Sequence, residues 1–298
     1  LRHEATVILL GAAAKHLHKE DPNVKSIMES LVSSLSTPVE SVQKAVADCL
    51  VPLVQARKTE DRVKELIEEL MTQVVDGDSY GARRGAAFGL SAFVKGSGIP
   101  AIKNHDLVSR LKEFASSGGN NQRQGALFAF ELLSDRLGML FEPYVITIVP
   151  LLLKSFSHSS DHVREAAQLG AKTIMGRLSS HGVKQVLTPI LQSLPTETQW
   201  KSRQEALRLL GSMAFCAPRQ LASCLPQVIP RLVEAGSDPH PKVKEGAKSA
   251  LADISSVIRN PEVSRLAPIL LKALTDPATQ TKAALEALLE CEFMHSID

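Results

Sequence analysis

The stretch Tyr80-Gly81-Ala82-Arg83-Arg84-Gly85-Ala86-Ala87-Phe88-Gly89-Leu90 decides the fold, because its central pattern returns about every forty residues. In this pattern a basic or amide residue is followed two and three places on by small residues, and then by a Leu-rich segment. The copies begin at Gln43, Arg83, Arg123, Arg164, Arg203 and Lys244, with a weaker copy at Thr281. The steps between them are 40, 40, 41, 39, 41 and 37 residues. Such a regular period predicts a repeat architecture.

Each period contains two amphipathic helical patterns, which are separated by a short polar turn. In the first helix, apolar residues recur at spacings of three and four, as in Val63, Leu66, Ile67 and Leu70. The second helix carries Ala or Gly where it would cross its partner. Helix pairs of this period are typical of HEAT repeats, which stack because one hairpin cannot bury both of its faces. The sequence therefore predicts an all-α protein, a HEAT-repeat α-solenoid (α-α superhelix).

The predicted array starts with a truncated leading helix near Glu4–His16 and continues as about seven helical hairpins. We expect a single HEAT-repeat array over residues 1–298. Its repeats are placed at residues 1–20 (partial), 21–58, 59–98, 99–139, 140–181, 182–217, 218–259 and 260–298. Both ends are apolar and lack the polar outer face of a capping repeat. We therefore interpret the chain as a fragment of a longer solenoid.

The composition argues against several functional classes. The net charge is +2, from 34 basic and 32 acidic residues, so any nucleic-acid contact must come from how the charges are distributed. No apolar run reaches the roughly 18 residues of a membrane span, and we expect no membrane partner. The cysteines form no CxxC pair, which is typical of reduced thiols in a cytoplasmic protein. They are Cys49, Cys216, Cys224 and Cys291.

No catalytic or cofactor-binding motif is present, so we expect no enzymatic activity, no cofactor and no small-molecule substrate. Gly96-Ser97-Gly98 lacks the Lys and the preceding strand of a phosphate loop, and we interpret it as a connector between repeats. His158 and His162 lie on either side of a turn without a third ligand nearby. A structural role is therefore favoured over a zinc site for this pair.

Basic residues gather in or near the first turn of successive second helices, where stacking would align many of them along one ridge. A cation is unfavourable at a helix N-terminus, so a compensating partner is expected. One alternative is a structural ladder, in which aspartates of the preceding turns accept hydrogen bonds. These aspartates are Asp76, Asp78, Asp161, Asp238 and Asp276. The other alternative is a polyanion such as ribosomal RNA.

We favour the structural ladder for the recurring Arg, and both alternatives stay open for the additional cations Arg84, Lys95, Lys103, Lys201 and Lys242. The candidate ribosome- or RNA-binding residues are Arg83, Arg84, Lys95, Lys103, Arg123, Arg164, Lys201, Arg203, Lys242 and Lys244. Trp200 opens a second helix beside Lys201. A stacking surface and a partly buried helix anchor both fit this position, and we favour the anchor.

Several longer segments resemble one known family. They are Tyr80–Leu90, Val94–Ile99, Gln124–Glu131, Leu140–Val145, His162–Ala167, Ser180–Lys184 and Ser256–Glu262. These segments are similar to the central region of the family of general control non-derepressible protein one. Its members are very large HEAT-repeat proteins that activate the stress kinase of translation initiation factor two alpha. The region is also similar to the HEAT domain of fungal elongation factor three. The resemblance runs from about Asp76 to Asp298, and the first two hairpins match only by register.

The resemblance implies a cytosolic scaffold that lies along stalled or colliding ribosomes and relays uncharged-tRNA stress to the kinase. This segment would belong to the ribosome-facing, elongation-factor-like portion. Its expected partner is the ribosome, through ribosomal RNA or a ribosomal protein, and the stress kinase would bind other regions of the full-length protein. The ATP-binding cassettes of the elongation factor are absent. Two alternatives remain open: a purely structural HEAT spacer, and a protein- or peptide-binding scaffold without ribosome contact.

Overall fold

The computed structural model describes residues 2–14, 16–17, 21–195, 197–216 and 218–257. Throughout these ranges the regular elements are helices, as the periodicity predicts. They are α1 (Arg2–Ala14), α2 (Pro22–Ser34), α3 (Glu40–Arg57), α4 (Asp61–Asp76), α5 (Tyr80–Ser97), α6 (Pro100–Asn104), α7 (Leu107–Ser117), α8 (Asn120–Leu137), the 3₁₀ turn η1 (Gly138–Leu140), α9 (Glu142–Ser155), α10 (Asp161–Met175), α11 (Ser180–Gln192), α12 (Trp200–Cys216), α13 (Pro218–Ala222), α14 (Leu225–Gly236) and α15 (Pro241–Val257). The predicted last hairpin, residues 260–298, lies outside the described residues, as do Asp276 and Cys291.

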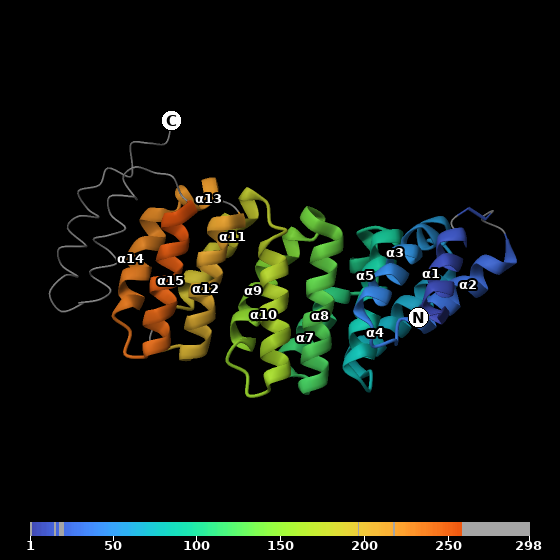
Figure 1. Ribbon diagram of the computed structural model, residues 1–298, viewed down its shortest axis with the longest axis horizontal. Coiled ribbons are helices and arrows are strands. Elements are labelled where there is room, and N and C mark those ends of the chain that lie inside the picture. The colour runs from blue at the N-terminus through green and yellow to red at the C-terminus, as the bar shows by residue number, and fades with distance from the viewer. Residues whose placement is uncertain (1, 15, 18–20, 196, 217, 258–298) are drawn as a thin grey trace. The chain divides into compact units, whose positions relative to one another are not determined.

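Contacts among the helices group the chain into two compact units, Leu1–Phe141 and Glu142–Asp298. In the first unit α2, α4 and α7 are first helices, and α3, α5 and α8 are second helices (Figure 1). The second helices pack on one another in sequence order, and α1 packs on α3 as a leading helix. The single array over residues 1–298 stays a prediction.

The predicted apolar faces lie in the core of the first unit. Val63, Leu66, Ile67 and Leu70 are all buried along α4. The start of α5 is capped by Ser79, whose side chain accepts a hydrogen bond from the backbone N–H of Ala82 at 3.1 Å. Local capping and the spacing of apolar residues therefore favour the same helix boundaries.

Small residues in the recurring pattern let the backbones of neighbouring repeats approach closely. A Cβ atom built on Gly85 would lie 1.7 Å from the carbonyl oxygen of Leu35, at the end of α2. At the same place one repeat later, a Cβ atom on Gly125 would lie 1.7 Å from the carbonyl oxygen of Val74 in α4. Glycine is therefore required at both positions by the packing of each second helix against the preceding repeat.

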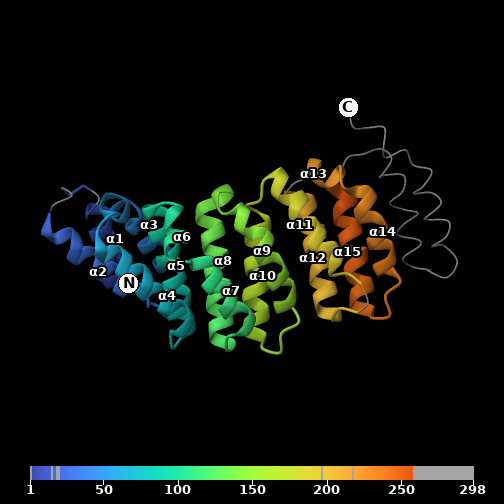
Figure 2. The same cartoon turned by 180° about the vertical axis from the view of Figure 1, so that it is seen from behind.

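The second unit repeats the arrangement with α9, α11 and α14 as first helices and α10, α12 and α15 as second helices (Figure 2). Glu142 at the start of α9 holds the start of α11, because its carboxylate accepts hydrogen bonds from the backbone N–H and the hydroxyl of Ser179, both at 2.7 Å. Leu251 of α15 is 1 % exposed, so the second helix of the last described hairpin also contributes to the core.

Candidate functional site

The recurring basic or amide side chain caps the end of the first helix in its own repeat. Gln43 Nε2 donates to the carbonyl oxygens of Leu35 and Thr37, at 3.1 and 2.6 Å. Arg83 Nη1 donates to the carbonyl oxygen of Gly77 at 2.7 Å. These carbonyl groups carry the partial negative charge of a helix C-terminus, which attracts a donor or a cation.

The same interaction recurs in later repeats. Arg123 donates to the carbonyl oxygens of Gly118 and Ala115, at 2.7 and 2.9 Å. Arg164 donates to the carbonyl oxygen of His158 at 2.5 Å, and Arg203 donates to that of Thr198. One side chain thus lies near the start of a second helix and also satisfies carbonyl groups at the end of the first helix, in the case of Arg123, or of the turn that follows it, in the case of Arg164 and Arg203. The charge at the start of each second helix is therefore compensated mainly by backbone carbonyl groups of the preceding helix end and turn.

The aspartate ladder is present in part. Asp161 accepts from Arg164, and Asp238 forms an ion pair with Arg203, with its Oδ2 atom 2.9 Å from Arg203 Nε. Asp76, in contrast, accepts a hydrogen bond at 3.0 Å from Gln122 rather than from a cation. The backbone carbonyl groups are the acceptors that the sequence analysis missed. No local sequence signal identifies them, because every residue has a carbonyl group.

Arg84 lies inside the first unit, where it links three second helices. Its guanidinium donates to both carboxylate oxygens of Glu131, at 2.5 and 3.0 Å, and to Glu40 at 3.1 Å. The guanidinium carbon also lies 5.4 and 4.9 Å from the ring centroids of Phe88 and Phe128. Burial alone would lower the pKa of Arg84, but the paired glutamates raise it above its usual value. Arg84 is thus a charged structural residue.

The structure corrects the surface role considered for three candidates. Arg83, Arg84 and Arg203 are only 5, 3 and 5 % exposed, so a polyanion outside the protein has little access to them. Arg123 and Arg164 are half-buried against the carbonyl groups described above. The candidates that remain accessible are lysines, because Lys95, Lys103 and Lys242 are exposed and Lys201 and Lys244 are half-buried.

Two of these lysines, Lys201 and Lys242, lie beside an aromatic pair in the second unit. The Trp200 ring at the start of α12 stacks on the ring of His240, just before α15, with centroids 4.1 Å apart and planes inclined by 8°. The Nζ atoms of Lys201 and Lys242 lie 5.7 and 5.4 Å from the centroid of the Trp200 ring. Trp200 is half-buried, so it both anchors the helix and contributes to the surface.

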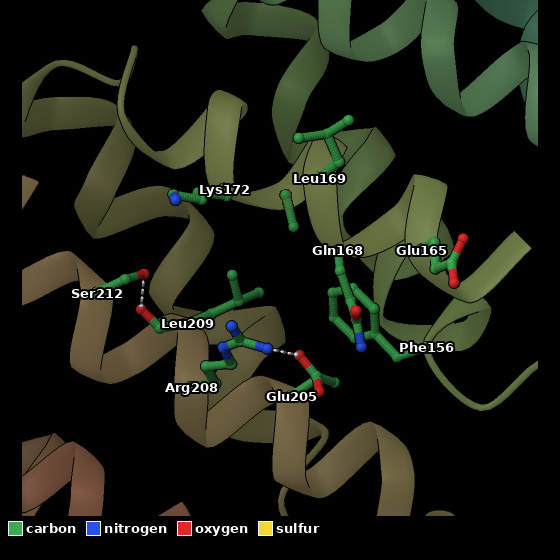
Figure 3. A pocket seen from close by; sticks show the side chains of 10 residues that line it. Phe156, Glu165, Gln168, Leu169, Lys172, Glu205, Arg208, Leu209 and Ser212 are labelled. Atoms are coloured by element: carbon green, nitrogen blue, oxygen red, sulfur yellow. Dashed lines mark hydrogen bonds and ion pairs between the residues drawn. The ribbon is translucent and has the colours of Figure 1, made fainter. Parts of the chain in front are cut away.

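A cavity of about 380 Å³ lies between α10 and α12 in the second unit (Figure 3). Its lining includes Phe156 and Leu169 together with charged residues of both signs. Glu205 lies here at the register position that holds Gly85 and Gly125 in the first unit. A long charged side chain thus stands where those repeats carry glycine. Burial raises the pKa of Glu205 above its usual value, and Arg208 at 3.7 Å opposes this shift.

Other candidate chemistry is limited in the part of the chain that the structure describes. Among these residues no group of three or more His, Cys, Asp or Glu side chains is placed to hold a metal ion. His158 Nδ1 instead accepts a hydrogen bond from the backbone N–H of Ser160 at 3.2 Å. Cys49 is half-buried, with its Sγ atom 3.8 Å from the carbonyl oxygen of Ile8, and Cys224 is buried. The described helices include none with the length and apolar character needed to cross a membrane.

Comparisons with known proteins agree with this architecture. A family model described as the EF3 N-terminal HEAT repeat matches residues 83–251, which is more than half of the chain. The solved structure of the karyopherin Kap121p, bound to the extreme C-terminus of the protein phosphatase Cdc14p, is similar with a TM-score of 0.59 at 16% identity. This similarity covers 96% of this chain and 32% of the karyopherin, and at such low identity it reports on the fold alone. The predicted HEAT-repeat α-solenoid is confirmed.

Two curated relatives match almost the whole chain. The stalled ribosome sensor GCN1 of Mus musculus is 47% identical over 296 residues, covering 99% of this chain and 11% of that protein. The eIF-2-alpha kinase activator GCN1 of Saccharomyces cerevisiae is 37% identical over 298 residues, with the same coverage. The chain thus spans 11% of the length of these relatives. It belongs to the family of the elongation factor 3 N-terminal HEAT repeat, and over nearly its whole length it is homologous to the GCN1 proteins.

Proposed function

We propose that this chain is a non-catalytic, ribosome-binding segment of a cytoplasmic scaffold in translational stress control. The observation that carries the proposal is its 47% identity, across 99% of its length, to a protein named as a stalled ribosome sensor. The segment supports activation of the initiation factor two alpha kinase by holding the longer protein on the ribosome, and the kinase binds other regions of that protein.

The accessible lysines provide the contact. Lys95, Lys103, Lys201, Lys242 and Lys244 retain surface exposure, whereas the buried arginines next to them hold the helices in place. Lysine ammonium groups bind the phosphates of RNA mainly through charge, and each contact releases a counterion. Since the net charge of the chain is only +2, the attraction depends on local clusters and weakens steeply as salt rises.

Co-sedimentation with purified ribosomes, at low and then at moderate salt, tests this proposal. In the test variant the five lysines named above are replaced by Ala. The matched control replaces five exposed lysines elsewhere, namely Lys25, Lys58, Lys64, Lys154 and Lys184. We expect the test variant to bind at least about tenfold more weakly with a shallower salt dependence, because several phosphate contacts are lost. The control should bind like the parent chain.

A structural spacer is the second candidate function. It is favoured by one observation, that the guanidinium groups of Arg83, Arg84 and Arg203 are buried and hydrogen-bonded within their helical units. A spacer would not sediment with ribosomes even at low salt. Equal losses in the two lysine variants would also refute a specific contact, since they would show that only total charge matters.

A further inference from the structure

We propose that Trp200, His240, Lys201 and Lys242 form a binding site for single-stranded RNA, in which an unpaired base stacks on the aromatic pair and the lysines hold the flanking phosphates. The inference deepens the proposed function, because it assigns a class of RNA to one part of the ribosome-binding surface. Proteins that bind single strands commonly combine aromatic stacking platforms with cations that follow the backbone.

The aromatic pair is held in place by a chain of polar contacts that begins in the core. Arg203, which is buried, donates to Asp238 Oδ1 at 3.0 Å. The same Asp238 atom accepts a hydrogen bond from the backbone N–H of His240 at 2.8 Å, which fixes the turn before α15. The backbone N–H of Lys242 then donates to His240 Nδ1 at 3.3 Å and orients the imidazole ring. The platform is therefore preorganised, which reduces the entropy lost on binding.

The charges around the platform favour a phosphate backbone. Asp238 is 4 % exposed and its charge is balanced by Arg203, so it does not repel an anion at the surface. Lys201 and Lys242 come from different helices and both lie near the Trp200 ring. When a base stacks on the Trp200 ring, the flexible lysine side chains move from the ring to the phosphates that flank this base in the RNA. Each ammonium group thus exchanges the aromatic ring for a phosphate.

The site also connects two consecutive repeats. Trp200 and His240 are 40 residues apart, which is one repeat period, and they lie at the starts of α12 and α15. A purely structural aromatic pair would join these helix ends without the flanking cations. The exposed Lys242 and the half-buried Lys201 instead place positive charge at a point that solvent can reach.

Trp200 is the single tryptophan of the chain, so its fluorescence reports directly on this site. We would titrate the 298-residue chain with a single-stranded oligonucleotide RNA, and in parallel with duplex RNA, heparin and polyglutamate. Stacking of a base should quench the fluorescence strongly with the single strand and weakly with the other three. Equal quenching by heparin or polyglutamate would overturn the proposal, because it would indicate a simple anion site.

Variants separate stacking from charge, with affinity measured by the anisotropy of labelled RNA. Trp200→Ala should weaken binding roughly 5- to 150-fold, the range for loss of one base–aromatic stack, whereas Trp200→Phe should restore most of the affinity. The Lys201→Ala/Lys242→Ala double variant should lower the salt slope by about 1.4, because it removes two single-strand phosphate contacts. The Lys154→Ala/Lys184→Ala variant serves as the matched control from the first helices of the same unit and should keep the parent slope.

Circular dichroism of each variant checks that it is folded. RNA binding without a change in Trp200 fluorescence would overturn the inference, and so would unchanged affinity in Trp200→Ala. If either of these results were obtained while the parent chain still co-sedimented with ribosomes, this site would be rejected but the proposed function would stand. If the parent chain did not co-sediment with ribosomes at low salt, the proposed function itself would be rejected.

Discussion

Replacement of Gly125 by Ala tests the close packing of the repeats. The added methyl group would lie 1.7 Å from the carbonyl oxygen of Val74, and 2.8 Å from its carbonyl carbon. Both are backbone atoms of α4, so rotation of a side chain cannot relieve the overlap. At the matching register position in the second unit, a Cβ atom built on Gly246 would meet its nearest neighbour, a side-chain atom of Leu207, at 3.5 Å.

These two glycines give opposite expected effects from the same substitution. In a helix interior, Ala is favoured over Gly by about 1 kcal/mol, and Gly246→Ala should gain most of this because the added methyl group would make only ordinary van der Waals contacts. Gly125→Ala receives the same gain but must move α8 away from α4 by more than 1 Å, as ordinary carbon–oxygen contact requires over 3 Å. Overpacking costs about 1–3 kcal/mol, and an overlap with backbone atoms should cost the upper end of this range. After the gain of about 1 kcal/mol is subtracted, we expect a net loss of about 2 kcal/mol.

Guanidinium unfolding followed by far-ultraviolet circular dichroism measures both variants against the parent chain. The transition of the first unit should move to lower denaturant in Gly125→Ala, and that of the second unit to higher denaturant in Gly246→Ala. Trp200 fluorescence identifies the second unit, since the chain has one tryptophan. A stabilising Gly125→Ala would refute the reasoning, because it would show that α8 does not lie against the end of α4.

Three further predictions concern the core and its charges. Leu90→Ala and Leu251→Ala should each cost about 2–5 kcal/mol of unfolding free energy in denaturant titrations, because both side chains are at most 1 % exposed; a loss below about 0.5 kcal/mol would contradict the helix register. Arg84→Met should cost about 3–5 kcal/mol in the same assay because Glu131 remains buried without its cation, and adding Glu131→Leu should recover much of the loss. Glu205→Gln should raise the melting temperature at pH 7 but not at pH 4: burial raises the folded-state pKa of Glu205 above 4.5, so the carboxylate destabilises the fold as pH rises through that pKa. An equal effect at both pH values would contradict this explanation.

The sequence predicts the repeats well because their signals are local and periodic. Spacing alone places Val63 and Leu66 in the core, and a Gly at residue 125 indicates a close helix crossing. The partner of Arg84 could not be predicted in this way, because Glu131 is 47 residues distant and the pairing depends on the rotation of α8. Long-range pairing of charges is decided by packing between repeats, for which a single repeat carries no signal.

The aromatic pair is an intermediate case. Trp200 and His240 differ by one period, so register arithmetic could have suggested their contact, although only the structure shows that the rings stack. The accessibility of the cations was harder to predict. Lys95 and Arg84 both belong to α5, yet Lys95 is exposed whereas Arg84 is buried, with only 3 % of its surface exposed. The two residues lie on different faces of the helix.

The Glu40–Arg84–Glu131 link has a mechanical consequence for the first unit. It joins α3, α5 and α8 through a single guanidinium, so the three repeats cannot splay apart without exposing or separating a buried charge. The spacing of α3, α5 and α8 in the first unit should therefore resist change. In the second unit, the cavity between α10 and α12 gives those repeats room to close or open at low elastic cost. Within the second unit, a change of spacing between repeats should therefore occur first at α10 and α12, whereas the three helices that Arg84 joins in the first unit keep their spacing.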